Sequence, residues 1–283
     1  MRTIRIGGVP EYFNLPILLA REQGKFAEKG IDLIWQDVPE GTGKMVQSLA
    51  EDALDLVVAL TEGMTKAIAQ GNPSKIIHAY VQSPLIWGIH TASQATSDNM
   101  NDLKGKTFAI SRYGSGSHLM AILLAKDLGW NESALAFEVV NNLDGARTAL
   151  KNGQAHIFLW EKYTTQFLVD QGEFKRVGVY PTPWPCFVIS ATDKSIANDP
   201  DGLTLILDII IEATQTLKSS PQAPRMIAER YNLLEKDVLD FWPNTEWNQE
   251  ITLPLEAISK VLTTFKTLGQ IGSGDKEVTF MLK

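Results

Sequence analysis

The hydrophobic residues of this chain alternate between short uninterrupted runs and longer segments in which they recur at helical spacing. A run such as residues 56–60 is typical of a buried strand, whereas the spacing in residues 15–23 is typical of an amphipathic helix. We expect strands at residues 3–9, 31–38, 56–60, 75–80, 106–111, 137–140, 155–159 and 186–191. We expect helices at residues 15–23, 43–50, 63–70, 117–128, 145–151 and 162–170. Strands that alternate with helices predict parallel sheets with helices on both faces.

The same order of elements occurs twice along the chain. Residues 3–24 and residues 107–129 each run from a strand through a loop into a helix that ends at a glycine. In both repeats a later apolar run leads to a glutamate, Glu62 in the first and Glu161 in the second. Because one unit is built twice, we predict an α/β fold of two lobes with a ligand-binding cleft between them. Each lobe is expected to be a mainly parallel sheet flanked by helices.

Two extended segments are the expected crossings between the lobes. Residues 85–90 and 185–190 both have prolines on their flanks. The first lobe is therefore expected to contain residues 1–87 plus 189–283, and the second residues 88–188. The C-terminal part of the first lobe is expected to form three helices, at residues 201–217, 222–231 and 253–268.

Composition narrows the class of protein. The formal net charge of −7 over 283 residues argues against nucleic acid, which selects basic surfaces. The single cysteine, Cys186, excludes an internal disulfide and a cysteine-based zinc cluster, and the four histidines lack metal-ligand spacing. We therefore expect no metal and no cofactor. The chain also has no apolar stretch of the length that a membrane span needs.

The start of the sequence bears on the compartment. Residues 1–4 lead directly into a strand without an apolar segment before it, so the sequence as written predicts a cytoplasmic protein. Removal of an export segment would instead leave a periplasmic or lipid-anchored protein. Both interpretations stay open.

Several short motifs resemble a known family. Residues 4–7, 19–26, 30–33, 102–106 and 149–153 are similar in sequence, order and spacing to type II periplasmic substrate-binding proteins. The branch they resemble captures nitrate, sulfonates, taurine and thiamine-pyrimidine precursors, as the SsuA-, ThiY- and NMT-like proteins do. This resemblance implies a two-lobed fold, a small-molecule ligand and an ABC-type importer as a possible partner, through its permease.

Three carboxylates lie in loops predicted at the carboxyl ends of strands, where open α/β sheets bind ligands. Glu11, Glu62 and Glu161 together would favour a cationic or hydrogen-donating ligand. Each of them could instead be placed by the dipole of a helix that begins nearby.

The loop at residues 111–117 is rich in glycine and serine and precedes a helix. Its backbone N–H groups, with Ser115 and Ser117, suit an acidic group, to which Arg112 could add a bidentate contact. Simple capping of the helix is the alternative for both serines. His118, on the same loop, is a candidate ligand contact, although a histidine at this position more commonly interacts with solvent at the start of the helix.

Aromatic residues also occupy loop or crossing positions rather than a helical stripe. They could sandwich a flat ring, although core packing would explain any one of them. The aromatic candidates are Tyr12, Phe13, Trp87, Tyr113, Trp160 and Trp184. Thr61, beside Glu62, completes the set of candidate ligand-binding residues.

The functional prediction is non-catalytic binding of a small, ring-bearing, amine-containing molecule in the cleft. The protein would act as the solute receptor of an importer or as an intracellular carrier or sensor, and we expect a monomer. A sulfonate or another small oxyanion is the alternative ligand. The alternative class is an enzyme, because eukaryotic thiamine-pyrimidine synthases share this fold. Those enzymes carry a cysteine-rich iron-binding stretch, whereas Cys186 stands alone here, and no catalytic residues are recognisable.

Overall fold

The computed structural model describes residues 2–97, 99–272 and 277–282. It divides into two compact units, Met1–Ser83 with Trp184–Lys283 and Pro84–Pro183. Each unit has one five-stranded sheet with helices packed against it. The predicted α/β fold with two mainly parallel sheets is confirmed.

The sheet of the first unit has the strand order β2-β1-β3-β10-β4. Strand β1 pairs in parallel with β2 and β3, whereas β10 is antiparallel to both β3 and β4. Four strands therefore run one way and β10 runs against them. The strands are β1 (Arg2–Gly8), β2 (Ile31–Asp37), β3 (Leu56–Leu60), β4 (Ser74–Val81) and β10 (Phe187–Thr192).

The sheet of the second unit repeats this topology with the order β7-β6-β8-β5-β9. Strand β6 is parallel to β7 and β8, and β5 is antiparallel to β8 and β9. The fourth strand is thus the reversed one in both sheets, which extends the sequence repeat to three dimensions. The strands are β5 (Ile86–Ala92), β6 (Phe108–Ile110), β7 (Phe137–Val139), β8 (Ile157–Glu161) and β9 (Phe174–Pro181).

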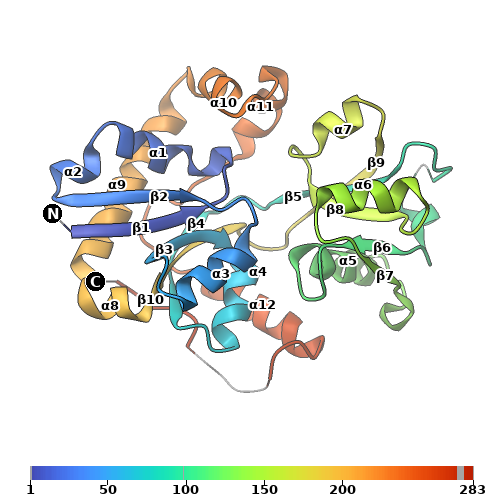
Figure 1. Cartoon of the computed structure of the whole chain (residues 1–283), viewed down its shortest axis with the longest axis horizontal. Helices are drawn as coiled ribbons and strands as arrows, with labels where there is room; N and C mark the ends of the chain where they lie inside the picture. The colour runs from blue at the N-terminus through green and yellow to red at the C-terminus, as the bar shows by residue number, and fades with distance from the viewer. Residues whose placement is uncertain (1, 98, 273–276, 283) are drawn as a thin grey trace. The chain divides into compact units, whose positions relative to one another are not determined.

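Helices cover both faces of the first sheet (Figure 1). On one side α1 packs against α9, and on the other α12 packs against α4. A buried cluster that includes Met45, Met64 and Ile258 joins α3, α4 and α12 to the sheet. The helices are α1 (Leu15–Glu22), α2 (Lys25–Glu28), α3 (Thr42–Ala50), α4 (Thr61–Ala69), α8 (Asp193–Asn198), α9 (Pro200–Ser219), α10 (Ala223–Tyr231), α11 (Glu235–Phe241) and α12 (Leu255–Thr267).

The second unit has three α-helices in its described part. Helix α5 contacts β6 and β8, and α6 also contacts both strands. Its buried cluster includes Ala146 and Leu150 of α6, Leu168 of α7 and Phe158 of β8. The helices are α5 (Gly116–Asp127), α6 (Leu143–Lys151) and α7 (Gln166–Asp170). Short 3-10 turns occur at Tyr12–Asn14, Met100–Leu103, Glu132–Ala134 and Trp242–Asn244.

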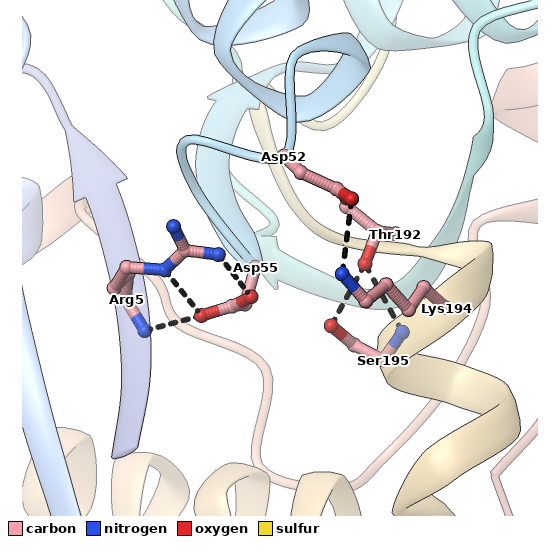
Figure 2. A network of polar contacts seen from close by, with 6 residues as sticks. All are labelled: Arg5, Asp52, Asp55, Thr192, Lys194 and Ser195. Atoms are coloured by element: carbon pink, nitrogen blue, oxygen red, sulfur yellow. Dashed lines mark hydrogen bonds and ion pairs between the residues drawn. The ribbon is translucent and has the colours of Figure 1, made fainter.

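A polar network ties together three strands of the first sheet (Figure 2). The Asp55 carboxylate accepts hydrogen bonds from the backbone N–H, Nε and Nη2 of Arg5 at 2.8, 3.0 and 2.7 Å. Asp55 precedes β3, and its carbonyl accepts the N–H of Thr192 at the end of β10. Beyond it, Lys194 pairs with Asp52 at 3.0 Å. This network lies at the amino end of β3, away from the loops expected to bind a ligand.

The structure adds the unpredicted helices α2, α8 and α11 and corrects the element predictions in two further places. The helix expected at residues 162–170 begins only at Gln166, because the backbone N–H of Thr164 turns back to the Glu161 carboxylate at 2.6 Å. Strand β9 was not predicted, since Gly178 and Pro181 interrupt its pattern, and its pairing with β5 joins segments distant in sequence. Among the described residues, no helix combines the length and apolar character needed to cross a membrane.

Candidate ligand-binding site

The carboxyl end of the first sheet brings two distant segments together. The chain leaves β3 at Leu60. Because β10 is antiparallel to β3, the segment before β10 enters its strand at the same edge, where Phe187 pairs with Leu60. The backbone N–H of Thr61 donates to the carbonyl of Cys186 at 3.0 Å, and its hydroxyl donates to the carbonyl of Pro185 at 2.6 Å. Thr61 is fully buried, so its polar groups fix the two segments to each other rather than facing solvent.

Glu62 and Trp184 form the polar centre of this edge. The indole Nε1–H of Trp184 donates to Oε2 of Glu62 at 2.9 Å. The other carboxyl oxygen, Oε1, is buried and has no hydrogen-bond partner among the described residues. Burial raises the pKa of Glu62 to about 7, against the opposing effects of its own backbone N–H and of Trp184. The Glu62 carboxyl is therefore buried, with one oxygen bonded to Trp184 and the other free to accept a further hydrogen bond.

The loop after β1 places its aromatic residues in the interior of the first unit. Tyr12 stacks on Phe241 with ring centroids 4.2 Å apart, and Phe13 lies 5.0 Å from Phe187. The Phe13 carbonyl also accepts hydrogen bonds from Tyr80 and Trp247. Both Tyr12 and Phe13 are buried in packed surroundings. Tyr12 and Phe13 therefore have the core-packing role that was one of the two interpretations of the sequence.

Asn14 is a polar residue near this edge that was missed as a site candidate. Its position before an apolar helix suggests a helix cap, but its side chain makes no capping bond. Instead Nδ2 donates to the carbonyl of Val9 at 2.8 Å, and the buried Oδ1 has no partner among the described residues. Glu11, on the same loop, is half-buried and also makes no side-chain cap.

In the second unit, Trp87 and Glu161 occupy the corresponding edge. They lie opposite each other on β5 and β8. Oε2 of Glu161 accepts from the N–H and hydroxyl of Thr164 at 2.6 and 2.7 Å, and burial raises the pKa of Glu161. The indole N–H of Trp87 is buried without a partner among the described residues. Trp160 is half-buried and stacks on Phe158 with centroids 5.3 Å apart.

The serines of the loop before α5 bond mainly to their own surroundings. The Ser117 hydroxyl accepts the N–H of Ser111 at 3.0 Å and lies 3.1 Å from the Ser115 hydroxyl. Ser115 caps α5 by accepting the N–H of His118 at 3.4 Å. Nδ1 of His118 accepts the N–H of Gly114 at 2.9 Å. Ser115 therefore caps the helix, which was the alternative considered from the sequence, and His118 bonds within the same loop.

Arg112 and Tyr113 are the exposed members of this loop. Tyr113 is 65% exposed, and its ring meets His118 edge-on with centroids 5.3 Å apart. Arg112 is exposed; its carbonyl accepts the N–H of Ser115, but its guanidinium has no hydrogen-bond or ion-pair partner within the described ranges. A cationic side chain without an internal partner is available to an acidic group.

A buried cluster behind the Glu161 loop was not found from the sequence. Nε2 of His90 accepts Nε–H of Arg176 at 3.3 Å, and its Nδ1 donates to the carbonyl of Phe158 at 3.2 Å. Arg176 also donates to the carbonyl of Lys162 and to Gln166, both at 2.6 Å. Burial and the nearby guanidinium lower the pKa of His90 to about 3, so the ring is neutral. These contacts tie residues 162–166 to β5 and β9.

Some candidate residues come together within a unit, and each unit has its own set. Thr61, Glu62 and Trp184 meet at one edge of the first unit, and Trp87 faces Glu161 in the second. Within the described residues, no group of three or more His, Cys, Asp or Glu side chains could hold a metal ion.

The chain is similar in sequence and fold to known periplasmic-binding-type proteins. Residues 87–180 match a protein-family model described as Ca3427-like PBP. The Candida albicans CA3427 gene product, reported to have the generic periplasmic binding protein fold, superimposes with a TM-score of 0.88. The two sequences are 25% identical, over 100% of this chain and 99% of that chain. The chain has the type II periplasmic-binding-protein fold.

Two bacterial small-molecule-binding proteins share this fold. The alkanesulfonate-binding protein SsuA from Xanthomonas axonopodis pv. citri, bound to MOPS, has a TM-score of 0.80 at 16% identity, over 98% of this chain and 96% of that chain. The periplasmic nitrate-binding protein NrtA from Synechocystis PCC 6803 has a TM-score of 0.70 at 16% identity, over 97% and 83%. No curated protein sequence matches this chain. The fold resemblance predicted from the sequence motifs is confirmed.

Proposed function

We propose that this chain binds a small amine, or another cationic hydrogen-donating molecule, and releases it unchanged. The observation that carries the proposal is the Glu62 carboxyl, whose Oε1 is buried without a partner among the described residues. A buried polar atom left unpaired costs about 1–3 kcal/mol, so such an atom is a natural place for a ligand donor. The fold supports the binding class, because SsuA and NrtA are binding proteins with the same architecture.

The ring-bearing character of the ligand rests on aromatic side chains in each unit. Trp184 is held in place by its bond to Glu62, and in the second unit Tyr113 is exposed on its loop. Ring faces of this kind favour flat or cyclic ligands through stacking and cation–π attraction. An aminopyrimidine or an aromatic amine would satisfy both requirements.

The proposed context is that of a solute receptor feeding an ABC-type importer, with the permease as its partner. The fold of sulfonate- and nitrate-binding proteins supports this role. An intracellular carrier or sensor would use the same chemistry without a transporter. The thiamine-pyrimidine-synthase-like enzyme stays the alternative class. It would have to work with Cys186 as the sole cysteine, and that residue is buried.

A second candidate ligand is a sulfonate or another small oxyanion. It is favoured by Arg112, which is exposed without an internal partner, and by the sulfonate-binding neighbours. MOPS, the molecule bound to SsuA, is a useful probe because it carries both a ring amine and a sulfonate.

A thermal-shift screen tests the proposal. Benzylamine and 4-aminopyrimidine form the amine arm, nitrate and propanesulfonate the anion arm, and MOPS combines the two. A ligand present at about 100 times its Kd stabilises by about 2.7 kcal/mol, which raises Tm by several degrees. We expect shifts from the amine arm that are lost in Glu62→Gln and kept in the matched surface control Glu40→Gln. Shifts confined to nitrate, sulfonates or taurine would contradict the amine proposal.

A further inference from the structure

Within the part of the chain that the structure describes, no cation balances the charge of the Glu62 carboxyl. It is 2% exposed, and its hydrogen-bond donors among the described residues are the Trp184 indole and its own backbone N–H. Burial is the largest influence on it, and no charged neighbour contributes. The site therefore resembles a buried neutral carboxyl more than a buried ion pair.

The charged groups on the neighbouring elements are engaged or exposed elsewhere. Lys44 of α3 is exposed and donates to Gln47, and Lys66 of α4 donates to Gln270 while lying over the Phe265 ring. On β4, Lys75 pairs with Asp193. The remaining titratable groups are Glu256, Lys260 and Lys266, exposed on α12, His78 and Tyr80, buried in β4, and Cys186, buried before β10.

An ionised carboxylate in such surroundings is unfavourable. Removing a charge from water without a counter-ion costs several kcal/mol, and a buried acid avoids this cost by keeping its proton. The pKa of about 7 expresses the same balance, since burial outweighs the two hydrogen bonds to the carboxylate. A bound ammonium group beside Oε1 would reverse the balance by supplying both a donor and a positive charge.

We propose that in mildly acidic solution Glu62 carries a proton in the unliganded protein and loses it to solvent when a cationic ligand binds, so that binding there releases about one proton and weakens as the pH falls. This inference rests on the proposed function. The carboxyl O–H bond breaks, its proton passes to the buffer, and an N–H of the ligand donates to Oε1. The Trp184 N–H can donate to Oε2 in both states, which keeps the carboxyl in one orientation.

Trp184 gives a direct reading of the Glu62 proton without any ligand. The ¹H–¹⁵N spectrum of the indole groups is recorded from about pH 5 to about pH 9, and the Trp184 signal is assigned with Trp184→Phe. We expect that signal to titrate near pH 7 in the wild-type protein and to stay constant in Glu62→Gln. A Trp184 signal that does not titrate in the wild-type protein overturns the inference.

Calorimetry with benzylamine, which stays protonated over this range, tests the linkage to binding. Titrations in two buffers of different ionisation enthalpy should show about one proton released near pH 6 and almost none near pH 8.5. The affinity should fall about tenfold per pH unit below pH 7. Glu62→Gln should bind more weakly and release no proton.

The possible failures are distinguishable. Benzylamine that binds with an affinity independent of pH and releases no proton overturns the inference and leaves the proposed function standing. Benzylamine and 4-aminopyrimidine that fail to bind at every pH, although the Trp184 signal titrates, overturn the amine proposal and this inference with it.

Discussion

Trp87 lies directly opposite Glu161 across β5 and β8, yet its indole N–H has no partner within the described residues. Trp184 and Glu62 occupy the corresponding places in the first unit, next to β10 and β3, and there the indole donates to the carboxyl at 2.9 Å. The difference arises because Glu161 accepts two bonds from Thr164 instead. The two repeats thus place the same pair of residue types at the same edge and bond them differently.

Substituting the two tryptophans should separate the value of this hydrogen bond from ring packing. Trp184→Phe leaves Glu62 without its indole donor and should cost about 1–3 kcal/mol more than Trp87→Phe, which removes an unpaired donor. Both variants lose a similar ring volume, so each is the control for the other. Urea unfolding followed by circular dichroism measures the difference. Equal costs would mean that the Trp184–Glu62 bond contributes nothing to stability.

Glu62→Gln should change the pH dependence of stability. Because the pKa of Glu62 is raised from 4.5 to about 7, the folded state holds a proton that the unfolded state has lost between these values. The contribution of the Glu62 proton to the free energy of unfolding is therefore fully present below about pH 4.5 and is lost as the pH rises to about 7. Above that pH the Glu62 carboxyl causes no further change in stability. The size of this contribution is on the order of 3 kcal/mol.

Unfolding curves at several pH values check this expectation. Glu62→Gln should gain stability relative to the wild-type protein as the pH rises through that window, whereas Glu40→Gln, on the surface, should follow the wild-type curve. Parallel curves for Glu62→Gln and the wild-type protein would show that the carboxyl ionises alike in both states.

Asp55→Asn should weaken the network at the amino end of β3 (Figure 2). The three bonds from Arg5 lower the pKa of Asp55, although burial opposes them. The contribution of these bonds to the free energy of unfolding is thus present above the ordinary pKa of an aspartate, and it is lost as the pH falls through the lowered pKa of Asp55. Because the Arg5 side chain is 38% exposed, we expect a cost of about 1–2 kcal/mol at neutral pH.

Asp52→Asn is the matched control in the same network. Its salt bridge to Lys194 is exposed on both sides, and asparagine tolerates the left-handed conformation of this position. The expected cost is below about 1 kcal/mol. Denaturation that ranks the two variants in the opposite order would show that the Asp55 bonds are not the stronger ones.

Gly88→Ala should disturb the His90 cluster. A Cβ at residue 88 would lie 2.5 Å from Cε1 of His90 and 3.0 Å from Nε of Arg176, and both groups are held by hydrogen bonds. We expect a loss of about 1–3 kcal/mol, as overpacking usually costs. A Cβ at Gly178 would lie 3.2 Å from the flexible Met100 side chain and in ordinary contact with Ile89 at 3.5 Å, so Gly178→Ala should cost less. Similar thermal unfolding of the two variants would argue against a rigid cluster.

Arg112→Ala tests the acidic-group contact of the second unit. If MOPS or propanesulfonate binds, removing the guanidinium should cost about 1.5–3 kcal/mol of binding free energy, as a lost charge-assisted hydrogen bond does. Arg21→Ala, on the surface of the other unit, is the control. Unchanged calorimetric affinity for the anion would leave the loop with its capping role alone.

Much of the fold could be predicted because its signals are local. The run at residues 56–60 became β3, which is buried on both faces, and the spacing at residues 15–23 became α1, since burial sets each pattern within a few residues. Strand β9 escaped prediction because its stability comes from pairing with β5, which no local pattern records.

The candidate site was only partly legible for the same reason. Glu62 could be placed at a strand end from the sequence, but the position of Asn14 before a helix suggests only a cap, and the His90–Arg176 contact was not anticipated. Those assignments depend on partners 5 and 86 residues away that a pattern does not identify.

The sequence by itself determined the repeated α/β units, because hydrophobic periodicity and helix-ending glycines act over one element at a time. Only the tertiary structure decided that a reversed strand, β10 or β5, enters the fourth place of each sheet. That placement joins Trp184 to Glu62 across 122 residues and leaves the carboxyl buried, with no counter-ion among the described residues. Protonation and free hydrogen-bonding capacity depend on such distant neighbours, since desolvation is a property of the whole packed unit.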